Sequence, residues 1–142
     1  MNTPVNIICM KWGDKYDASY VNKLYNMVSR NLSRKFRFIC LTDDNSGFLS
    51  SIESFDIPKL NLPEGIPERG WTKLVTFSKH ISDIKGQCLF FDLDIKINDN
   101  IDFLASEFDK FTVIDSTPWK KEKLRTLLIN NDTLVNSSIM RW

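Results

Sequence analysis

Short apolar runs recur along the 142-residue chain and predict the strands of a buried sheet. The segments Val5–Met10, Phe36–Leu41, Cys88–Phe91 and Phe111–Ile114 are short and dense in apolar residues, as strands buried on both faces are. Ile52–Ile57 is less apolar and predicts a peripheral strand. The chain therefore carries the pattern of a protein built around one sheet.

Segments with helical spacing lie between these runs. The clearest is 17–31, whose apolar residues recur every three or four positions, at Val21, Leu24, Tyr25 and Val28, with Leu32 just beyond. The segment 71–81 has similar spacing, 101–108 predicts a short helix, and the basic segment 116–131 fits either a helix or a loop. The resulting order, β-α-β-β-α-β-α-β, favours an α/β fold with a mostly parallel, wound sheet flanked by helices.

Composition narrows the class of protein. The length suits a single domain spanning residues 1–142, and the formal net charge of +1 gives no reason to expect nucleic-acid or membrane partners. Three cysteines lie in strand-like runs without Cys-x-x-Cys or zinc spacing, which favours buried, reduced thiols. The N-terminus lacks a basic region, and its apolar run is too short for a signal core or a membrane span. We therefore expect a soluble, cytoplasmic protein.

The segment from Arg30 to Arg37 is locally basic, with Arg34 and Lys35 between them. We interpret it as a solvated helix end, since cations complement the dipole at a helix C-terminus. Binding of an anion is the alternative.

The strongest chemical signal is the run Cys88-Leu89-Phe90-Phe91 followed by Asp92-Leu93-Asp94. Side chains alternate along a strand, so two aspartates separated by one residue project to the same side. Ligands of open α/β sheets bind at the carboxyl ends of strands, where this pair falls. Two carboxylates there suit Mg²⁺ or Mn²⁺ holding a diphosphate. The alternative is a pair of exposed acids that cap the following turn.

Four segments, in this order along nearly the whole chain, resemble GT-A glycosyltransferases, particularly bacterial proteins related to the family 8 retaining galactosyl- and glucosyltransferases. They are Ile7–Gly13 with Tyr16 following, Gly70–Leu74, Leu89–Asp94 and Asn136–Met140. The resemblance implies a GT-A-like fold of the nucleotide-diphospho-sugar transferase type. It also implies a nucleotide diphosphate sugar as donor, with a UDP-hexose as the family-level expectation, and a saccharide or other hydroxyl-bearing acceptor.

The resemblance also implies roles for particular residues. Asp92 and Asp94 match the family's Asp-x-Asp and would bind the metal, with Asp92 also contacting the ribose. The first strand and its loop would hold the nucleotide, and Lys73 would reach toward the diphosphate. The expected nucleotide-binding residues are Met10, Lys11, Trp12, Tyr16, Lys73 and Asp92.

Some of these residues have a plainer interpretation. Tyr16 is a candidate for stacking on the base, but it could equally pack at a helix start, and Trp12 has the same ambiguity. Lys73 fits a solvated helix lysine as well. On the side of the sugar and acceptor, Asn136 and Ser137 match a family segment, while Asp115 ends the next strand on the same sheet edge.

The chain departs from the family pattern near its end. Related enzymes take a third metal ligand, usually His, from a later segment, whereas the single His, His80, precedes the Asp-x-Asp. The sequence given stops inside an apolar run, which would leave Ile139, Met140 and Trp142 with few partners unless they pair with another chain as a homo-oligomer. A fragment, a shortened remnant and a protomer completed by association are all compatible with this ending.

The sequence thus predicts a metal-dependent glycosyltransferase, or its donor-binding domain. A non-catalytic nucleotide-binding or assembly module of the same fold is the main alternative. A phosphatase of the haloacid-dehalogenase type is a further one, because Phe91-Asp92-Leu93-Asp94 looks like its first motif. Those proteins usually continue with a threonine two residues after the second Asp, whereas Ile95-Lys96 follows here, late in the chain.

Overall fold

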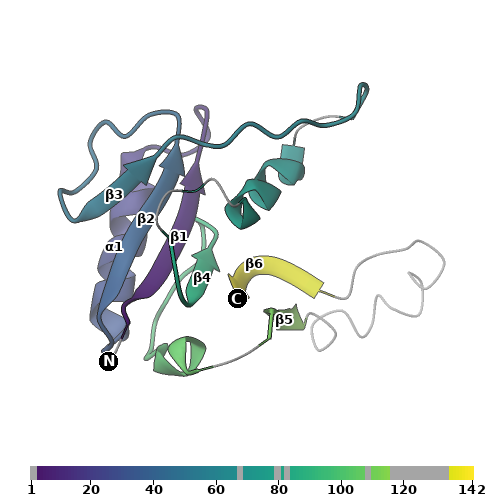
Figure 1. Ribbon diagram of the computed structural model, residues 1–142. Coiled ribbons are helices and arrows are strands. Elements are labelled where there is room, and N and C mark those ends of the chain that lie inside the picture. Colours follow the sequence, from purple (N-terminus) through teal and green to yellow (C-terminus); the bar gives the residue numbers. More distant parts are fainter. Residues whose placement is uncertain (1–2, 67–68, 79–80, 82–83, 108–109, 116–134) are drawn as a thin grey trace, which may run out of the picture.

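In the computed structural model, the described residues form one six-stranded sheet in the order β3-β2-β1-β4-β6-β5 (Figure 1). The structure describes residues 3–66, 69–78, 81, 84–107, 110–115 and 135–142, with only the backbone for 69, 70 and 135. The strands are β1 (Val5–Lys11), β2 (Phe36–Thr42), β3 (Ile52–Phe55), β4 (Cys88–Phe91), β5 (Thr112–Asp115) and β6 (Val135–Arg141). One α-helix, α1 (Ala18–Asn31), and two 3₁₀ helices, η1 (Arg69–Phe77) and η2 (Asp102–Ala105), complete the described elements.

The sheet is mixed. Strands β3, β2, β1 and β4 pair in parallel, whereas β6 is antiparallel to both of its neighbours, β4 and β5. The predicted α/β class is therefore confirmed as a mixed α/β architecture, and the expected strands lie in it with bounds shifted by at most two residues. The described part contains fewer helices than a doubly wound sheet usually has.

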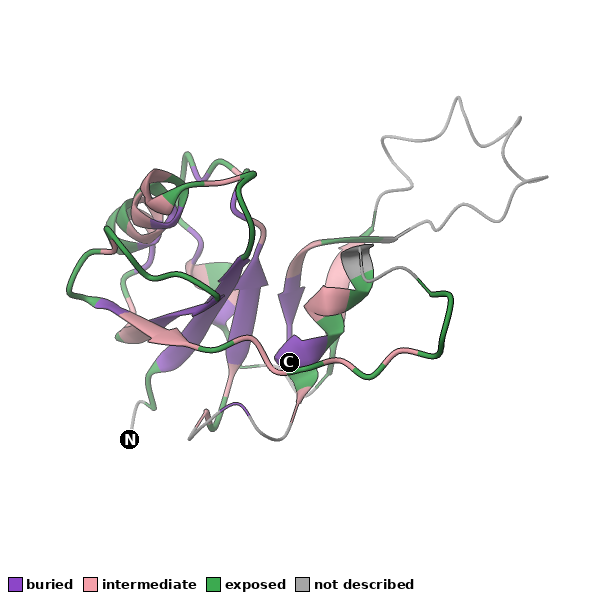
Figure 2. Ribbon diagram, turned by 90° about the horizontal axis from the view of Figure 1, so that it is seen from above, coloured by how far each residue is buried: buried purple, intermediate pink, exposed green. Residues whose placement is uncertain are grey.

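Alternation of side chains along the strands divides the core into two layers. On the face covered by α1, the side chains of Ile7, Cys9, Phe38, Leu89 and Phe91 pack against the helix. On the opposite face, their strand neighbours pack with Val75 of η1, and this set comprises Ile8, Met10, Ile39, Leu41, Cys88 and Phe90. Figure 2 shows the buried positions concentrated in the central strands. Burial on both faces explains why these strands read as continuous apolar runs.

Helix α1 covers its face of the sheet with Val21, Leu24 and Val28, all fully buried. Asp17 caps the start of the helix, because its Oδ1 accepts a hydrogen bond from the Ser19 N–H at 2.8 Å. A hydrogen bond with the Ser19 side chain, together with this backbone bond, lowers the pKa of the Asp17 carboxyl. The predicted helix over 17–31 is thus confirmed, with its first residue acting as the cap.

The two other predicted helices are shorter and tighter than expected. Residues 69–77 and 102–105 form 3₁₀ turns in place of helices over 71–81 and 101–108. In η1, the Thr76 hydroxyl donates to the Lys73 carbonyl at 2.8 Å, a local side-chain bond of the kind that competes with α-helical pairing. His80 and the segment 116–131, for which the sequence left two structures open, lie outside the described residues.

The last apolar run returns into the sheet between β4 and β5. Met140 pairs with Phe90 in the register and is buried. Trp142 and Cys88 exchange two backbone hydrogen bonds, of 2.8 and 3.1 Å, and the Trp142 ring lies 4.6 Å from that of Phe77. The expectation that Ile139, Met140 and Trp142 lack partners within the chain is wrong, because an antiparallel strand inside the sheet supplies them.

The basic segment after α1 makes intramolecular contacts. Arg37 forms a bidentate ion pair with Glu53 of β3, with hydrogen bonds of 2.9 and 2.7 Å. Arg34 donates to the Ala105 carbonyl and to Gln87. Arg34 and Arg37 therefore join neighbouring elements, whereas Arg30, in the last turn of α1, and Lys35 are exposed as the interpretation of a solvated helix end predicts. No helix in the described part combines the length and apolar character needed to cross a bilayer.

Candidate functional site

A cavity of about 290 Å³ lies at the carboxyl ends of β1 and β4. These strands are parallel neighbours, so the segments that follow them meet at one edge of the sheet. The lining of this cavity contains six of the seven residues expected to bind the metal or the nucleotide. The full lining is Met10, Trp12, Lys15, Tyr16, Lys73, Asp92, Leu93 and Asp94.

Asp92 is held from two sides. Its Oδ1 lies 2.7 Å from the Lys73 ammonium, and both side chains are partly buried. Its backbone N–H donates to the Ser138 carbonyl at 2.9 Å, which extends the pairing between β4 and β6 by one residue. Lys73 also donates to the carbonyl and the hydroxyl of Ser137, each at 3.3 Å. The Lys73 ammonium, carried by η1, thus links the Asp-x-Asp segment to β6.

Asp94 contacts the segment that follows β1. The Tyr16 hydroxyl donates to its Oδ2 at 3.2 Å. The Lys15 ammonium lies 4.8 Å from the centre of the Tyr16 ring, and its hydrogen bond to that side chain raises the pKa of Lys15, with Asp94 and Asp92 contributing in the same direction. Each carboxylate of the pair therefore has a neighbouring hydrogen-bond donor and lies near a lysine.

The two aromatic residues of the cavity differ in what surrounds them. Tyr16 is half-buried, packs beside the α1-side core and meets the Tyr20 ring edge-on at 4.7 Å. Trp12 is 45% exposed. A flat, accessible ring is what stacking on a base requires, so Trp12 is the better placed of the two. Tyr16 acts here as a packing residue and as the hydrogen-bond donor to Asp94.

The loop that carries Trp12 is held by Asp43, which lies in the segment after β2. Gly13 has a φ of +62°, a left-handed conformation that glycine adopts without strain, and its N–H donates to Asp43 Oδ2 at 3.0 Å. Sequence reasoning did not identify Asp43 or Lys15 as part of this region. The acidic end of the second strand was the available signal for Asp43, whereas nothing in the spacing singled out Lys15.

Four expected site residues lie outside the cavity lining, namely Lys11, Asp115, Asn136 and Ser137. Lys11 is buried and donates to the Asp44 carbonyl at 3.4 Å. It follows Met10 on β1, and successive strand residues face opposite sides, which fits the absence of Lys11 from the lining. Asp115 and Asn136 lie where β5 and β6 pair, and Asn136 Oδ1 accepts from the Ser138 N–H at 2.7 Å. Ser137 reaches the site through Lys73.

The donor set at the cavity fits a hard divalent cation. Asp92 and Asp94 line the same cavity, and Mg²⁺ or Mn²⁺ is commonly held by one or two carboxylates together with phosphate oxygens and water. Among the described residues, no three His, Cys, Asp or Glu side chains gather into a group that could hold a metal. A cation here would therefore complete its coordination with ligand or solvent oxygens.

The chain matches no protein-family model, no curated protein and no solved structure. The resemblance to GT-A glycosyltransferases consequently rests on the four segments named above. The site itself adds that residues from these segments, distant in sequence, line or adjoin one cavity.

Proposed function

We propose that the chain is a metal-dependent glycosyltransferase of GT-A-like fold, or the donor-binding domain of one. It would move a hexose from a nucleotide diphosphate sugar to a hydroxyl acceptor. The observation that carries this proposal is the placement of Asp92, Asp94 and Lys73 around one cavity at the carboxyl ends of parallel strands. That combination of two carboxylates and a lysine suits a metal-bound diphosphate.

Each cavity side chain has a task in this proposal. Trp12 offers its exposed ring to the base, and Lys73 offsets charge on the diphosphate. Asp92 and Asp94 hold the divalent cation, which when bound neutralises charge on the leaving diphosphate. Tyr16 orients Asp94 through its hydroxyl, and Ser137 orients Lys73. Positioning and electrostatics supply the rate enhancement, because a nucleotide diphosphate is already a good leaving group.

A non-catalytic nucleotide-binding or assembly module is the second candidate. The Lys73–Asp92 ion pair favours it, since the ammonium already offsets the charge of one of the two carboxylates. Both candidates bind a nucleotide diphosphate at the same residues. They differ in turnover, because the module leaves a nucleotide sugar intact in the presence of any acceptor.

Calorimetric titration of UDP, GDP and a UDP-hexose, each with and without Mn²⁺, tests the proposal. We expect one nucleotide to bind in a Mn²⁺-dependent manner. The Asp92→Ala/Asp94→Ala variant should keep its fold, because both side chains lie outside the buried cores, and should bind that nucleotide at least about 100-fold more weakly.

The matched control is Asp56→Ala/Asp99→Ala, which removes the same charge from exposed positions outside the cavity. Its nucleotide affinity should equal that of the parent chain. Equal binding by the two double variants would sink the metal-site proposal. Release of inorganic phosphate from a simple phosphoester, abolished by Asp92→Ala, would instead favour the phosphatase interpretation.

A further inference from the structure

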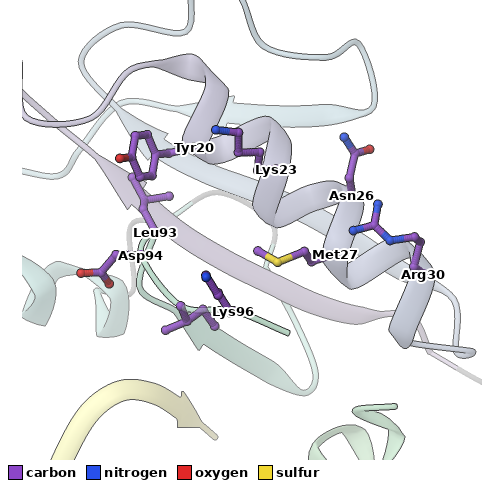
Figure 3. Close-up of a pocket in the computed structure, with 9 residues that line it drawn as sticks. Tyr20, Lys23, Asn26, Met27, Arg30, Leu93, Asp94 and Lys96 are labelled. Carbon is purple, nitrogen blue, oxygen red and sulfur yellow. The ribbon is translucent and has the colours of Figure 1, made fainter. Parts of the chain in front are cut away.

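A second, larger cavity of about 420 Å³ lies between α1 and the segment that follows β4 (Figure 3). It shares Leu93 and Asp94 with the cavity described above. The Asp94 side chain therefore stands at the boundary between the two cavities. We call this second cavity the α1 groove.

One wall of the α1 groove is a single stripe of the helix. Tyr20, Lys23, Met27 and Arg30 follow the three- and four-residue spacing that places side chains on one helix face, and Asn26 lies beside them. The facing wall is 93–96, which contributes Leu93, Asp94, Ile95 and Lys96. Figure 3 shows the helix stripe on one side and Lys96 and Asp94 on the other.

The groove carries an excess of positive charge. Lys23, Arg30 and Lys96 stand against the single carboxylate of Asp94, so the lining has a net charge of +2. Within the described part of the chain, none of these three cations forms an ion pair with a carboxylate. The Lys23 ammonium lies 5.5 Å from the centre of the Tyr20 ring. This contrasts with Arg37, which is paired with Glu53, and marks the groove as a site for an external anion.

The other lining groups suit a sugar. Met27, Leu93 and Ile95 provide an apolar surface, while Asn26 and the Tyr20 hydroxyl supply hydrogen-bonding groups. Lys23 and Arg30 are two helical turns apart, which corresponds to about 10 Å along the axis. The long, exposed side chains of Lys23 and Arg30 can converge on one anion from these positions, and a ligand that extends from that anion to Asp94 is larger than an inorganic anion and matches a sugar with an anionic substituent.

We propose that the α1 groove is the acceptor site, and that the acceptor is a saccharide bearing a phosphate or a carboxylate. This inference rests on the proposed function, in which Asp94 belongs to the donor site. The acceptor hydroxyl lies toward Asp94 and the donor cavity, and the anionic substituent lies among Lys23, Arg30 and Lys96.

The test is titration of the full chain, without nucleotide, with glucose 6-phosphate, glucuronate and uncharged glucose at low ionic strength. We expect at least one of the two anionic sugars to bind, and glucose to bind at least about tenfold more weakly. Raising the salt concentration should weaken binding further, because the cations are exposed. The tighter of the two anionic sugars identifies the substituent as a phosphate or a carboxylate.

The variant Lys23→Gln/Arg30→Gln should reduce affinity for the anionic sugar about tenfold or more, and Lys96→Gln should reduce it in the same direction. Lys35→Gln/Lys59→Gln removes the same charge from exposed positions outside the groove and should leave affinity unchanged. Absence of binding by both anionic sugars overturns the proposal, and so does an equal loss in the groove and control variants.

Mn²⁺-dependent nucleotide binding, measured on the same variants, separates this inference from the proposed function. The groove variants should bind nucleotide as the parent chain does. Nucleotide binding without anionic-sugar binding overturns the acceptor site alone. Anionic-sugar binding without nucleotide binding overturns the glycosyltransferase assignment and the acceptor role, while the groove remains a site for anionic sugars.

Discussion

Lys73 joins three groups at the candidate site, namely the Asp92 carboxylate and the carbonyl and hydroxyl of Ser137. Its ammonium also lies 5.1 Å from the centre of the Phe90 ring. A cation in this place has two opposite effects on ligands. It competes electrostatically with a divalent cation for Asp92, and it attracts the phosphates that such a cation would carry.

Replacing Lys73 by Met should separate these effects. We expect Mn²⁺ alone to bind the Lys73→Met variant several-fold more tightly, because its ligand Asp92 loses a competing charge. A nucleotide diphosphate with Mn²⁺ should bind about tenfold more weakly, because a charge-assisted contact to phosphate is lost. Lys59→Met, at an exposed position outside the cavity, is the control for both titrations. Changes of the same sign in both titrations would contradict this account of Lys73.

Only part of the candidate site was predictable from the sequence. Asp92 and Asp94 were predictable as a pair of carboxylates that follows a buried strand, but strand alternation does not set their directions, because β4 ends at Phe91 and Asp94 lies in the turn after it. Lys73 was predictable only by resemblance, since its contact with Asp92 depends on how η1 packs over the sheet. Lys15 was not predictable at all, because its place over the Tyr16 ring comes from the local course of the loop after β1.

Strand β6 is the element whose place in the fold the sequence indicated least. Its apolar run was visible, but its antiparallel position between β4 and β5 depends on pairings remote in sequence. The other strands were predictable because burial on both faces leaves a continuous apolar run. The 3₁₀ form of η1 and η2 was not, since apolar spacing over one or two turns does not distinguish the helix types.

Met140→Ala tests whether β6 is integral to the sheet. Met140 is 4% exposed and packs in the core layer opposite α1, so its truncation should lower the free energy of unfolding by about 2–4 kcal/mol. Phe103→Ala, at a side chain that is 68% exposed, should cost less than about 1 kcal/mol. Urea denaturation followed by circular dichroism measures both. If Met140→Ala lowered the free energy of unfolding no more than Phe103→Ala does, β6 would not be part of the core.

At the scale of the whole molecule, the three cysteines report on the integrity of the sheet. They lie on β1, β2 and β4 and are all buried. Burial raises the pKa of Cys88 to about 11 and raises that of Cys9 as well. The native fold thus favours the neutral thiol of Cys88. Its contribution to the free energy of unfolding is fully present below the unfolded pKa of about 8.5 and is lost as the pH rises through the native pKa of about 11.

Thiol titration at pH 8 measures this protection. The thiolate fraction of Cys88 in the native chain is about one in a thousand, so its reaction with a disulfide reagent should be at least about a hundredfold slower than in the unfolded chain. In urea we expect the three thiols to become reactive in a single transition that coincides with the loss of ellipticity. Immediate reaction of any one thiol in native buffer would show that part of the sheet opens independently.

The position of β6 has a consequence for the order of folding. Among the strands that the structure describes, β5 is paired with β6 alone, although β5 precedes β6 in the chain. During synthesis, residues 112–115 therefore cannot pair in the sheet until residues 135–141 have been made. By then, β1, α1, β2 and β3 can already pack against one another. The first half of the chain can collapse early, and the side of the sheet beyond β4 is completed late, by pairing between segments that are remote in sequence.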